Sequence, residues 1–140
     1  MKAAVIYWSG TGNTEMMANA IVEGAKEGGI EVELFEVTEI TPEDALKYDA
    51  LALGCPAMGD EVLEEYDFEP FFADLEKSLG GHKVAIFGSY SWNDGQWMRD
   101  WYARTEESGA VLLQTEGLMA YDTPNDEDLA KCKELGKSLK

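Results

Sequence analysis

Residues 9–14 read Ser-Gly-Thr-Gly-Asn-Thr, and they stand between an apolar run at 2–8 and a segment with helical spacing at 14–26. A strand followed by a glycine-rich turn and a helix directs successive backbone N–H groups to one point, which makes an anion site. The glycines let the backbone approach a ligand closely. Neither lysine nor arginine occurs in this stretch, so the sequence predicts a phosphate site built from neutral donors.

The stretch also differs from the two common nucleotide-binding loops. A Walker A loop needs a lysine after its last glycine, and a dinucleotide fingerprint needs a third glycine where this chain has Glu15. Without a cation or a metal clamp, phosphoryl transfer is disfavoured. Neutral donors suit a phosphate monoester that is held in place and never transferred.

Strand-like and helix-like segments alternate along the chain, which predicts an α/β fold in one domain over residues 1–140. Right-handed crossovers give a parallel sheet with helices on both faces. Trp97 and Trp101 repeat at helical spacing and are expected in the core. The further strands are expected at 32–37, 50–53, 84–88 and from 111, and the further helices from 41 and at 70–79, 96–107 and 126–139.

Three turn-rich segments follow the first, third and fourth strands, at 9–14, 55–61 and 89–95. In a parallel sheet the carboxyl ends of the strands share one edge, and ligands bind there where the strand order reverses. The three segments are therefore expected to meet in one binding site.

The chain is strongly acidic, with 28 acidic and 11 basic residues, a formal net charge of −17 and a pI near 4.2. This charge repels nucleic acids and anionic membranes and favours a basic docking surface on another protein.

One histidine and two distant cysteines are too few for a zinc site, a Ser-His-Asp triad or a disulfide framework, and the cysteines are expected to be buried. The sequence shows no signal peptide or membrane span, so a cytoplasmic protein is expected.

The string S-G-T-G-N-T after a first strand resembles the FMN-phosphate loop of the flavodoxins. The segments GCPAMGDE at 54–61 and FGSYSWNDG at 87–95 resemble the two isoalloxazine-binding loops of that family. The resemblance covers all 140 residues and implies a doubly wound five-stranded parallel sheet in the order 2-1-3-4-5. Because little chain separates Val111 from Asp126, it implies the short-chain form, without the long insertion that splits strand five in larger relatives. The motifs are closest to those of flavodoxins from fermentative anaerobic bacteria.

The resemblance implies that FMN is the cofactor and that all three loops bind it. Met58 would pack on the inner face of the flavin, Trp92 would stack on its outer face, and Glu61 would accept from the flavin N3–H. Backbone groups near Ser91 would meet the pyrimidine edge. The implied cofactor-binding residues are Ser9, Gly10, Thr11, Gly12, Asn13, Thr14, Pro56, Ala57, Met58, Gly59, Asp60, Glu61, Ser89, Tyr90, Ser91, Trp92, Asp94 and Gly95. Neither a catalytic residue nor a metal ligand is expected.

The resemblance further implies a low-potential one-electron carrier that substitutes for ferredoxin, with FMN cycling between a neutral semiquinone and an anionic hydroquinone. The carbonyl of Gly59 would turn to meet the protonated flavin N5, which a glycine permits because positive φ costs it little. Six acids within residues 60–69 would disfavour the anionic form and lower the second potential. A phosphate loop without a cation acts in the same direction.

The third loop departs from the family pattern. Ser91 and Asn93 flank Trp92, where close relatives commonly carry glycine on both sides. Both side chains restrict the backbone, so the sequence leaves the path of this loop open.

Two other functions use the same fold. An FMN-dependent NAD(P)H:quinone-type reductase is the alternative to a carrier, and the minimal length, the lack of a basic nicotinamide-phosphate patch and the lack of a candidate acid–base histidine near the loops disfavour it. A receiver-like signalling domain needs an aspartate at the end of the third strand, where the chain reads Gly54-Cys55-Pro56.

For the carrier, the resemblance implies partners such as ferredoxin-linked oxidoreductases, reductases and hydrogenase, which would dock on an acidic face of a monomer.

Overall fold

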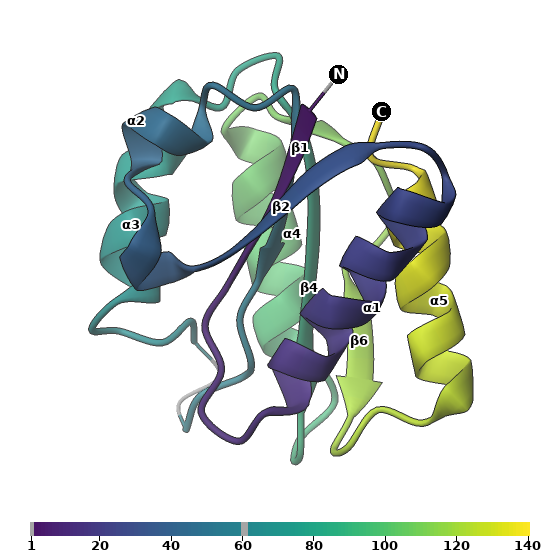
Figure 1. Ribbon diagram of the computed structural model, residues 1–140. Helices are drawn as coiled ribbons and strands as arrows, with labels where there is room; N and C mark the ends of the chain where they lie inside the picture. The colour runs from purple at the N-terminus through teal and green to yellow at the C-terminus, as the bar shows by residue number, and fades with distance from the viewer. Residues whose placement is uncertain (1, 60–61) are drawn as a thin grey trace.

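The computed structural model describes residues 2–59 and 62–140, and its centre is a parallel β-sheet with helices on both faces (Figure 1). The strand order is β2-β1-β3-β4-β5, which confirms the doubly wound order that the resemblance implied. The strands are β1 (Lys2–Tyr7), β2 (Glu31–Glu36), β3 (Ala50–Gly54), β4 (Lys83–Tyr90), β5 (Val111–Leu112) and β6 (Leu118–Tyr121). β1, β3 and β4 are buried along almost their whole length, as expected of parallel strands that are covered on both sides.

Two helices, α1 (Asn13–Glu27) and α5 (Asp126–Lys137), cover one face of the sheet (Figure 1). The other face is covered by α2 (Pro42–Ala45), α3 (Phe68–Leu75) and α4 (Gln96–Glu107). α4 has the predicted bounds. The helix expected at 70–79 begins at Phe68, and its last turn is the 3₁₀ helix η2 (Glu76–Ser78); a second 3₁₀ helix, η1 (Val37–Glu39), follows β2. None of the helices in the described residues has the length and apolarity to cross a membrane.

The last strand is divided in two, because β5 and β6 pair with opposite ends of β4. The side-chain carbonyl of Gln114 accepts a hydrogen bond from the Ile86 N–H, where a continuous strand would offer a backbone carbonyl. Leu113 still donates its N–H to the carbonyl of Val84. The single last strand expected from residue 111 is thus two short segments, and the sheet has six strands when they are counted separately.

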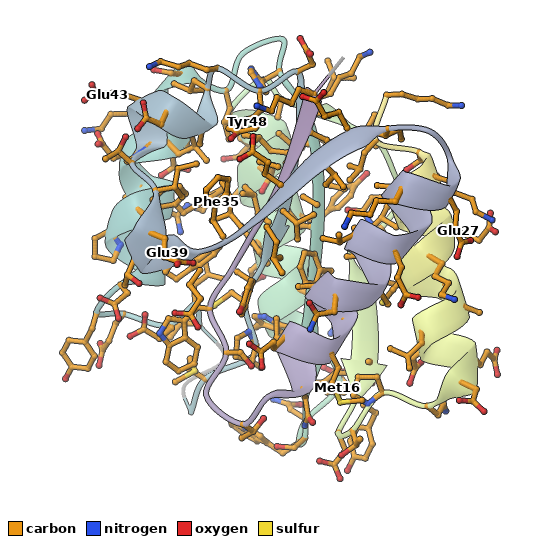
Figure 2. The ribbon with its side chains drawn as sticks, in the orientation of Figure 1. Met16, Glu27, Phe35, Glu39, Glu43 and Tyr48 are labelled. Carbon is orange, nitrogen blue, oxygen red and sulfur yellow. The ribbon has the colours of Figure 1, made fainter. Side chains whose placement is uncertain are left out.

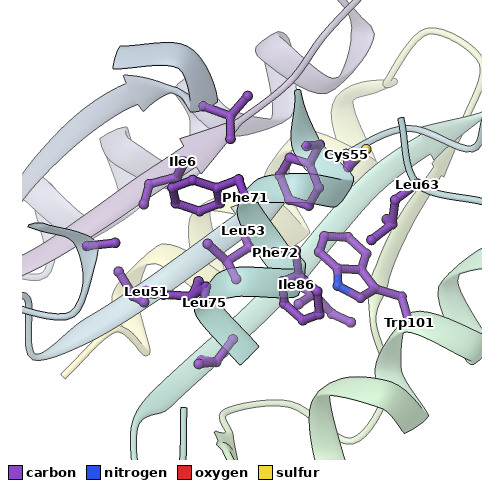
Figure 3. Close-up of a cluster of buried hydrophobic side chains, with 14 of the residues drawn as sticks. Ile6, Leu51, Leu53, Cys55, Leu63, Phe71, Phe72, Leu75, Ile86 and Trp101 are labelled. Atoms are coloured by element: carbon purple, nitrogen blue, oxygen red, sulfur yellow. The ribbon is translucent and has the colours of Figure 1, made fainter. Parts of the chain in front are cut away.

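Each face of the sheet has its own hydrophobic core. The core beneath α3 and α4 contains Trp97 and Trp101, which are 1% and 2% exposed and thereby confirm the expected core positions. Figure 3 shows Trp101 among the other side chains of this core. Cys55 lies in this core and Cys132 lies in the core beneath α1 and α5, and both are buried free thiols as predicted.

The two helices α1 and α5 touch backbone to backbone. A Cβ atom added to Gly24 would overlap the carbonyl oxygen of Lys133, and one added to Gly136 would overlap that of Ile21. Glycine at these positions is therefore required by close packing and not by backbone conformation. The two helices therefore pack directly against each other and form one layer on this face of the sheet.

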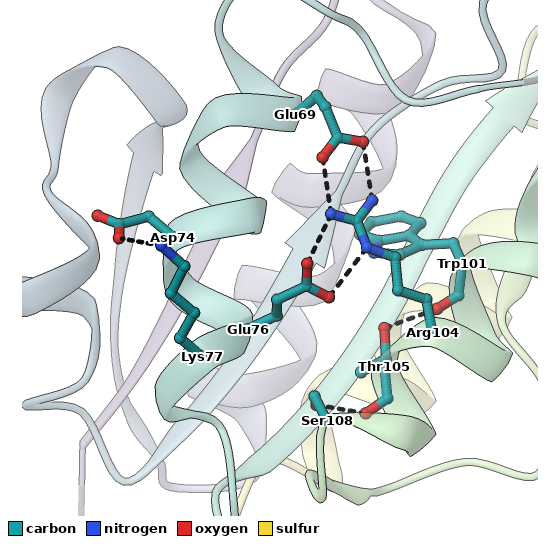
Figure 4. A network of polar contacts seen from close by, with 8 residues as sticks. All are labelled: Glu69, Asp74, Glu76, Lys77, Trp101, Arg104, Thr105 and Ser108. Atoms are coloured by element: carbon teal, nitrogen blue, oxygen red, sulfur yellow. Dashed lines mark hydrogen bonds and ion pairs between the residues drawn. The ribbon is translucent and has the colours of Figure 1, made fainter.

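Arg104 links α3 to α4 across the other face (Figure 4). Its guanidinium donates to both carboxylate oxygens of Glu69, at 2.8 and 2.7 Å, and to both of Glu76, at 2.9 and 2.8 Å. Bidentate pairs of this kind fix geometry as well as charge. One consequence is that the charge of Glu69, expected from the sequence to act on the site, already has a partner within the fold.

Candidate functional site

The loop at 9–14 joins β1 to α1 and leaves several N–H groups open at the start of the helix. Gly12 has a φ of 96°, and the hydroxyl oxygen of Ser9 accepts from the N–H groups of Gly12 (3.1 Å) and Glu15 (3.3 Å). Within residues 2–59 and 62–140, the N–H of Ser9 and four further N–H groups of this turn donate to no protein acceptor. We call these four the cradle, and they belong to Gly10, Thr11, Asn13 and Thr14.

The cradle opens into a hollow of about 200 Å³ at the carboxyl edge of the sheet. Residues from all three predicted segments line it, so the structure brings the three loops together as the sequence predicted. The predicted residues along its wall are Gly10, Thr11, Asn13, Pro56, Ala57, Met58, Ser89, Tyr90 and Ser91.

The remaining predicted residues support the wall or lie beside it. Thr14 is buried, and its hydroxyl lies 2.9 Å from the hydroxyl of Ser89, which ties the first loop to β4. The others that do not line the hollow are Ser9, Gly12, Gly59, Trp92, Asp94 and Gly95. Asp60 and Glu61 lie outside the described residues.

The second loop, residues 55–64, is held at both ends. The Ala57 N–H donates to the carbonyl of Ser89 at 3.0 Å, and the Met58 N–H donates to the carbonyl of Val62 at 3.1 Å. At its base the Glu64 N–H donates to the Cys55 sulfur at 3.4 Å. Burial raises the pKa of the Cys55 thiol, which therefore stays protonated.

Glu64 fixes the exit of this loop with its side chain. It is only 3% exposed, and its carboxylate accepts three backbone hydrogen bonds, from Tyr66 (2.8 Å), Asp67 (2.8 Å) and Phe68 (2.9 Å). The sequence reading treated Glu64 as one of six acids acting on the site from solvent. Its carboxylate instead satisfies N–H groups at the start of α3, which is a structural role.

Replacing Glu64 with glutamine is expected to lower the free energy of unfolding by about 1–2 kcal/mol. A glutamine carbonyl can accept at most part of the three bonds, and its NH₂ group would face an N–H donor. Glu65→Gln next to it is the matched control, because the Glu65 side chain is exposed. Urea unfolding of both variants measures the difference, and equal stability of the two would contradict the assigned role.

The third loop, residues 89–95, takes a path that its sequence left open. Asn93 adopts a φ of 64°, a left-handed conformation that asparagine tolerates better than most residues. Gly95, with a φ of 92°, precedes α4, and the carboxylate of Asp94 pairs with Arg99 at 2.9 Å. Trp92 at the tip is 46% exposed. Asn93 therefore provides a left-handed conformation in this loop without a glycine.

Two lining residues were missed by the sequence reading, Trp8 and Asp122. A Cβ atom on Gly10 would lie 3.1 Å from the Trp8 ring, so the loop passes close over the indole. Asp122 follows β6, and its N–H donates to the carbonyl of Tyr90 at 2.6 Å. Both residues follow the carboxyl end of a parallel strand, and that position was the signal that could have identified them.

The lining fits a phosphate ester that carries a flat apolar group. The cradle offers backbone donors at a helix N-terminus, while Trp8, Met58 and Tyr90 provide apolar and aromatic surface beside it. No lysine or arginine is among the described residues of the wall. No group of three or more histidine, cysteine or acidic residues in the described part of the chain is arranged to hold a metal ion.

Comparison with known proteins agrees with this geometry. The profile of the family described as Flavodoxin matches residues 5–136. The chain belongs to the flavodoxin family. It is 47% identical to the flavodoxin of Clostridium beijerinckii, covering 96% of both chains, and 45% identical to that of Megasphaera elsdenii, covering 96% of this chain and 95% of the other.

A solved relative has the same fold over the whole chain. The solution structure of two-electron reduced Megasphaera elsdenii flavodoxin superimposes with a TM-score of 0.86 at 44% identity, covering 98% of this chain and 97% of that one. Proteins of the flavodoxin family bind FMN, and the two relatives named flavodoxin are electron-transfer proteins and not enzymes. FMN is therefore the cofactor, and the reductase alternative is not favoured.

Proposed function

We propose that this chain is a low-potential one-electron carrier that substitutes for ferredoxin, its bound FMN alternating between the neutral semiquinone and the anionic hydroquinone. The observation that carries the proposal is the cradle, a set of open N–H groups at the start of α1, with neither lysine nor arginine among the described residues that line the hollow. FMN supplies the redox chemistry when bound. The protein supplies a site that holds it without covalent attachment.

The cradle binds the phosphate in this proposal. Thr11 and Asn13 line the hollow, and in this proposal their side chains add to the four N–H donors. The hydroxyls of Ser9 and Thr14 already make hydrogen bonds within the protein, so their main role is to shape the loop. A helix N-terminus provides about half a positive charge, which favours an anion there without a lysine or arginine.

The second and third loops hold the ring system. Met58 packs on one face from the wall of the hollow, and Trp92, which follows the lining residue Ser91, stacks on the other face. The 46% exposure of Trp92 is consistent with a side chain that a planar ligand would cover, and such stacking contributes about 0.5–1.5 kcal/mol beyond its area term. Asp60 and Glu61 keep the roles expected from the resemblance as proposals, with Glu61 accepting from the flavin N3–H.

The charge of the protein favours a reducing carrier. Glu65 and Asp67 are exposed, whereas Glu64 and Glu69 have partners within the fold, so fewer of the acids at 62–69 act on the site from solvent than the sequence suggested. The net charge of −17 still opposes the gain of another negative charge, by an amount that salt reduces. The same charge supports docking of redox partners, such as ferredoxin-linked oxidoreductases, reductases and hydrogenase, on an acidic face of a cytoplasmic monomer.

An anaerobic titration with dithionite tests the proposal. The purified protein is expected to be yellow and to pass through a blue one-electron reduced form before it loses its colour. A protein that takes up no FMN would overturn the assignment of the site. A protein that binds FMN but shows no intermediate colour would overturn the one-electron couple and leave the cofactor in place.

Replacing Gly59 with alanine is expected to lower the yield of the one-electron reduced form, because its carbonyl must reorient and alanine disfavours positive φ by about 1 kcal/mol. Among the described residues, no atom outside its chain neighbours lies within 4 Å of a Cβ atom on Gly59, so the effect comes from backbone conformation and not from a clash with them. Gly80→Ala is the control, because its Cβ atom is equally free and it lies before β4, at the opposite end of that strand from the site. The fraction of this form at half reduction is the readout, and an unchanged fraction would contradict the role of Gly59.

A further inference from the structure

Glu15 places a carboxylate in the first turn of α1, next to the cradle. Its N–H donates to the Ser9 hydroxyl at 3.3 Å, so its backbone belongs to the frame that shapes the phosphate loop. A carboxylate at this position competes with a phosphate for the positive end of the same helix, and the two anions repel each other. A loop without a cation is especially sensitive to where this charge lies.

Tyr7 determines where the carboxylate lies. The Tyr7 hydroxyl donates to Oε2 of Glu15 at 2.8 Å. Tyr7 is the last residue of β1, is 5% exposed and packs in the core beneath α1 with Met17 and Ala18. Because its ring is fixed by the sheet and the core, the hydroxyl is a rigid donor.

The hydrogen bond between Tyr7 and Glu15 lies outside the lining of the hollow. Among the described residues, neither Tyr7 nor Glu15 lines the hollow next to the cradle. Tyr7 instead lines a separate hollow of about 130 Å³, together with Ser9, Glu36 and Asp67. Burial and the hydrogen bond to Glu15 raise the pKa of Tyr7, so its hydroxyl stays a donor across the physiological range.

We propose that Tyr7 is a positioning residue for phosphate binding, whose hydroxyl holds the Glu15 carboxylate away from the cradle. This inference rests on the proposed function, since the phosphate concerned is that of FMN. It explains how the loop binds an anion although Glu15, an acid, stands where a dinucleotide fingerprint would have its third glycine. It also predicts an effect on FMN that riboflavin, which has the same ring system and no phosphate, does not share.

The test compares FMN and riboflavin as ligands of the 140-residue chain after its flavin has been removed. Dissociation constants are measured for the wild type, Tyr7→Phe, Glu15→Gln and the double variant, at low and at high salt. Tyr48→Phe is the matched control, because the Tyr48 hydroxyl donates to Glu33 at 3.1 Å in the same kind of pair. Figure 2 places Tyr48 near the upper edge of the molecule and Met16, the neighbour of Glu15, near the lower edge.

Tyr7→Phe is expected to weaken FMN binding about three- to tenfold at low salt, and less at high salt, while riboflavin binding stays unchanged. The double variant is expected to bind FMN as tightly as Glu15→Gln alone, and Tyr48→Phe is expected to change neither ligand. Equal losses for FMN and riboflavin would overturn the inference, because they would indicate general damage to the fold. Unchanged FMN binding by Tyr7→Phe would also overturn it. A wild type that binds neither flavin would overturn the proposed function and the inference together.

Discussion

Gly24→Ala is expected to destabilise the protein by about 1–2 kcal/mol. A methyl group at this position would overlap the carbonyl oxygen of Lys133, and neither backbone can move without separating α1 from α5. Overpacking of this kind typically costs 1–3 kcal/mol, and here it outweighs the helix propensity of up to about 1 kcal/mol that alanine adds. Thermal or urea unfolding measures the loss.

Gly28→Ala on the same helix is the matched control. Gly28 has a φ of −82°, and an added Cβ atom would meet its neighbours at 3.5 Å, which is ordinary contact. The free energy of unfolding of Gly28→Ala is expected to stay unchanged or to rise by up to about 1 kcal/mol, because alanine reduces the entropy of the unfolded chain. Equal stability of the two variants would contradict the close contact between α1 and α5.

Asn13→Asp is expected to weaken FMN binding about hundredfold or more. Asn13 lines the hollow and contributes one of the cradle N–H groups, so the substitution puts a carboxylate beside the proposed phosphate at almost constant volume. At about 4 Å and an effective dielectric constant near 20, two unit charges of like sign repel by about 4 kcal/mol. Titration of the flavin-free protein with FMN gives the dissociation constant.

In the absence of FMN, the Asn13→Asp variant is expected to be more stable than the wild type. Asn13 is the first residue of α1, where an acid favours the helix by about 0.3–1 kcal/mol when no phosphate is bound. Asn19→Asp makes the same chemical change farther along the exposed side of α1 and is expected to change FMN affinity less than threefold. Equal losses from the two substitutions would show that net charge, and not the cradle, controls the affinity.

The sequence predicted most of the fold because its hydrophobic pattern is consistent along the chain. Uninterrupted apolar runs identified the central strands, and aromatic residues at helical spacing placed α4 at its observed bounds. The strand order came with the resemblance of three loops, since a pattern of alternating elements alone does not determine it. The cradle was predictable because strand, glycine-rich turn and helix follow each other directly.

Other features depend on the direction of single side chains, which no sequence pattern encodes. Glu64 and Glu65 are adjacent and chemically identical, yet one is buried against three N–H groups and the other is exposed. Gln114 interrupts the last strand because its side chain reaches a backbone donor. Asn93 adopts a left-handed conformation in the loop whose path the sequence left open, because an asparagine tolerates this conformation better than most residues.

The interruption beside β4 also affects how the sheet moves. A strand amide that is bonded to a backbone carbonyl exchanges its hydrogen with solvent only when a segment of the sheet opens. The Ile86 amide is covered by the Gln114 side chain, which can leave by rotating about its own bonds. The hydrogen of Ile86 therefore records side-chain rotation, while that of Leu113, bonded to the backbone of Val84, records separation of the strands. Two amides between β4 and the divided last strand thus distinguish local motion from the opening of the fold.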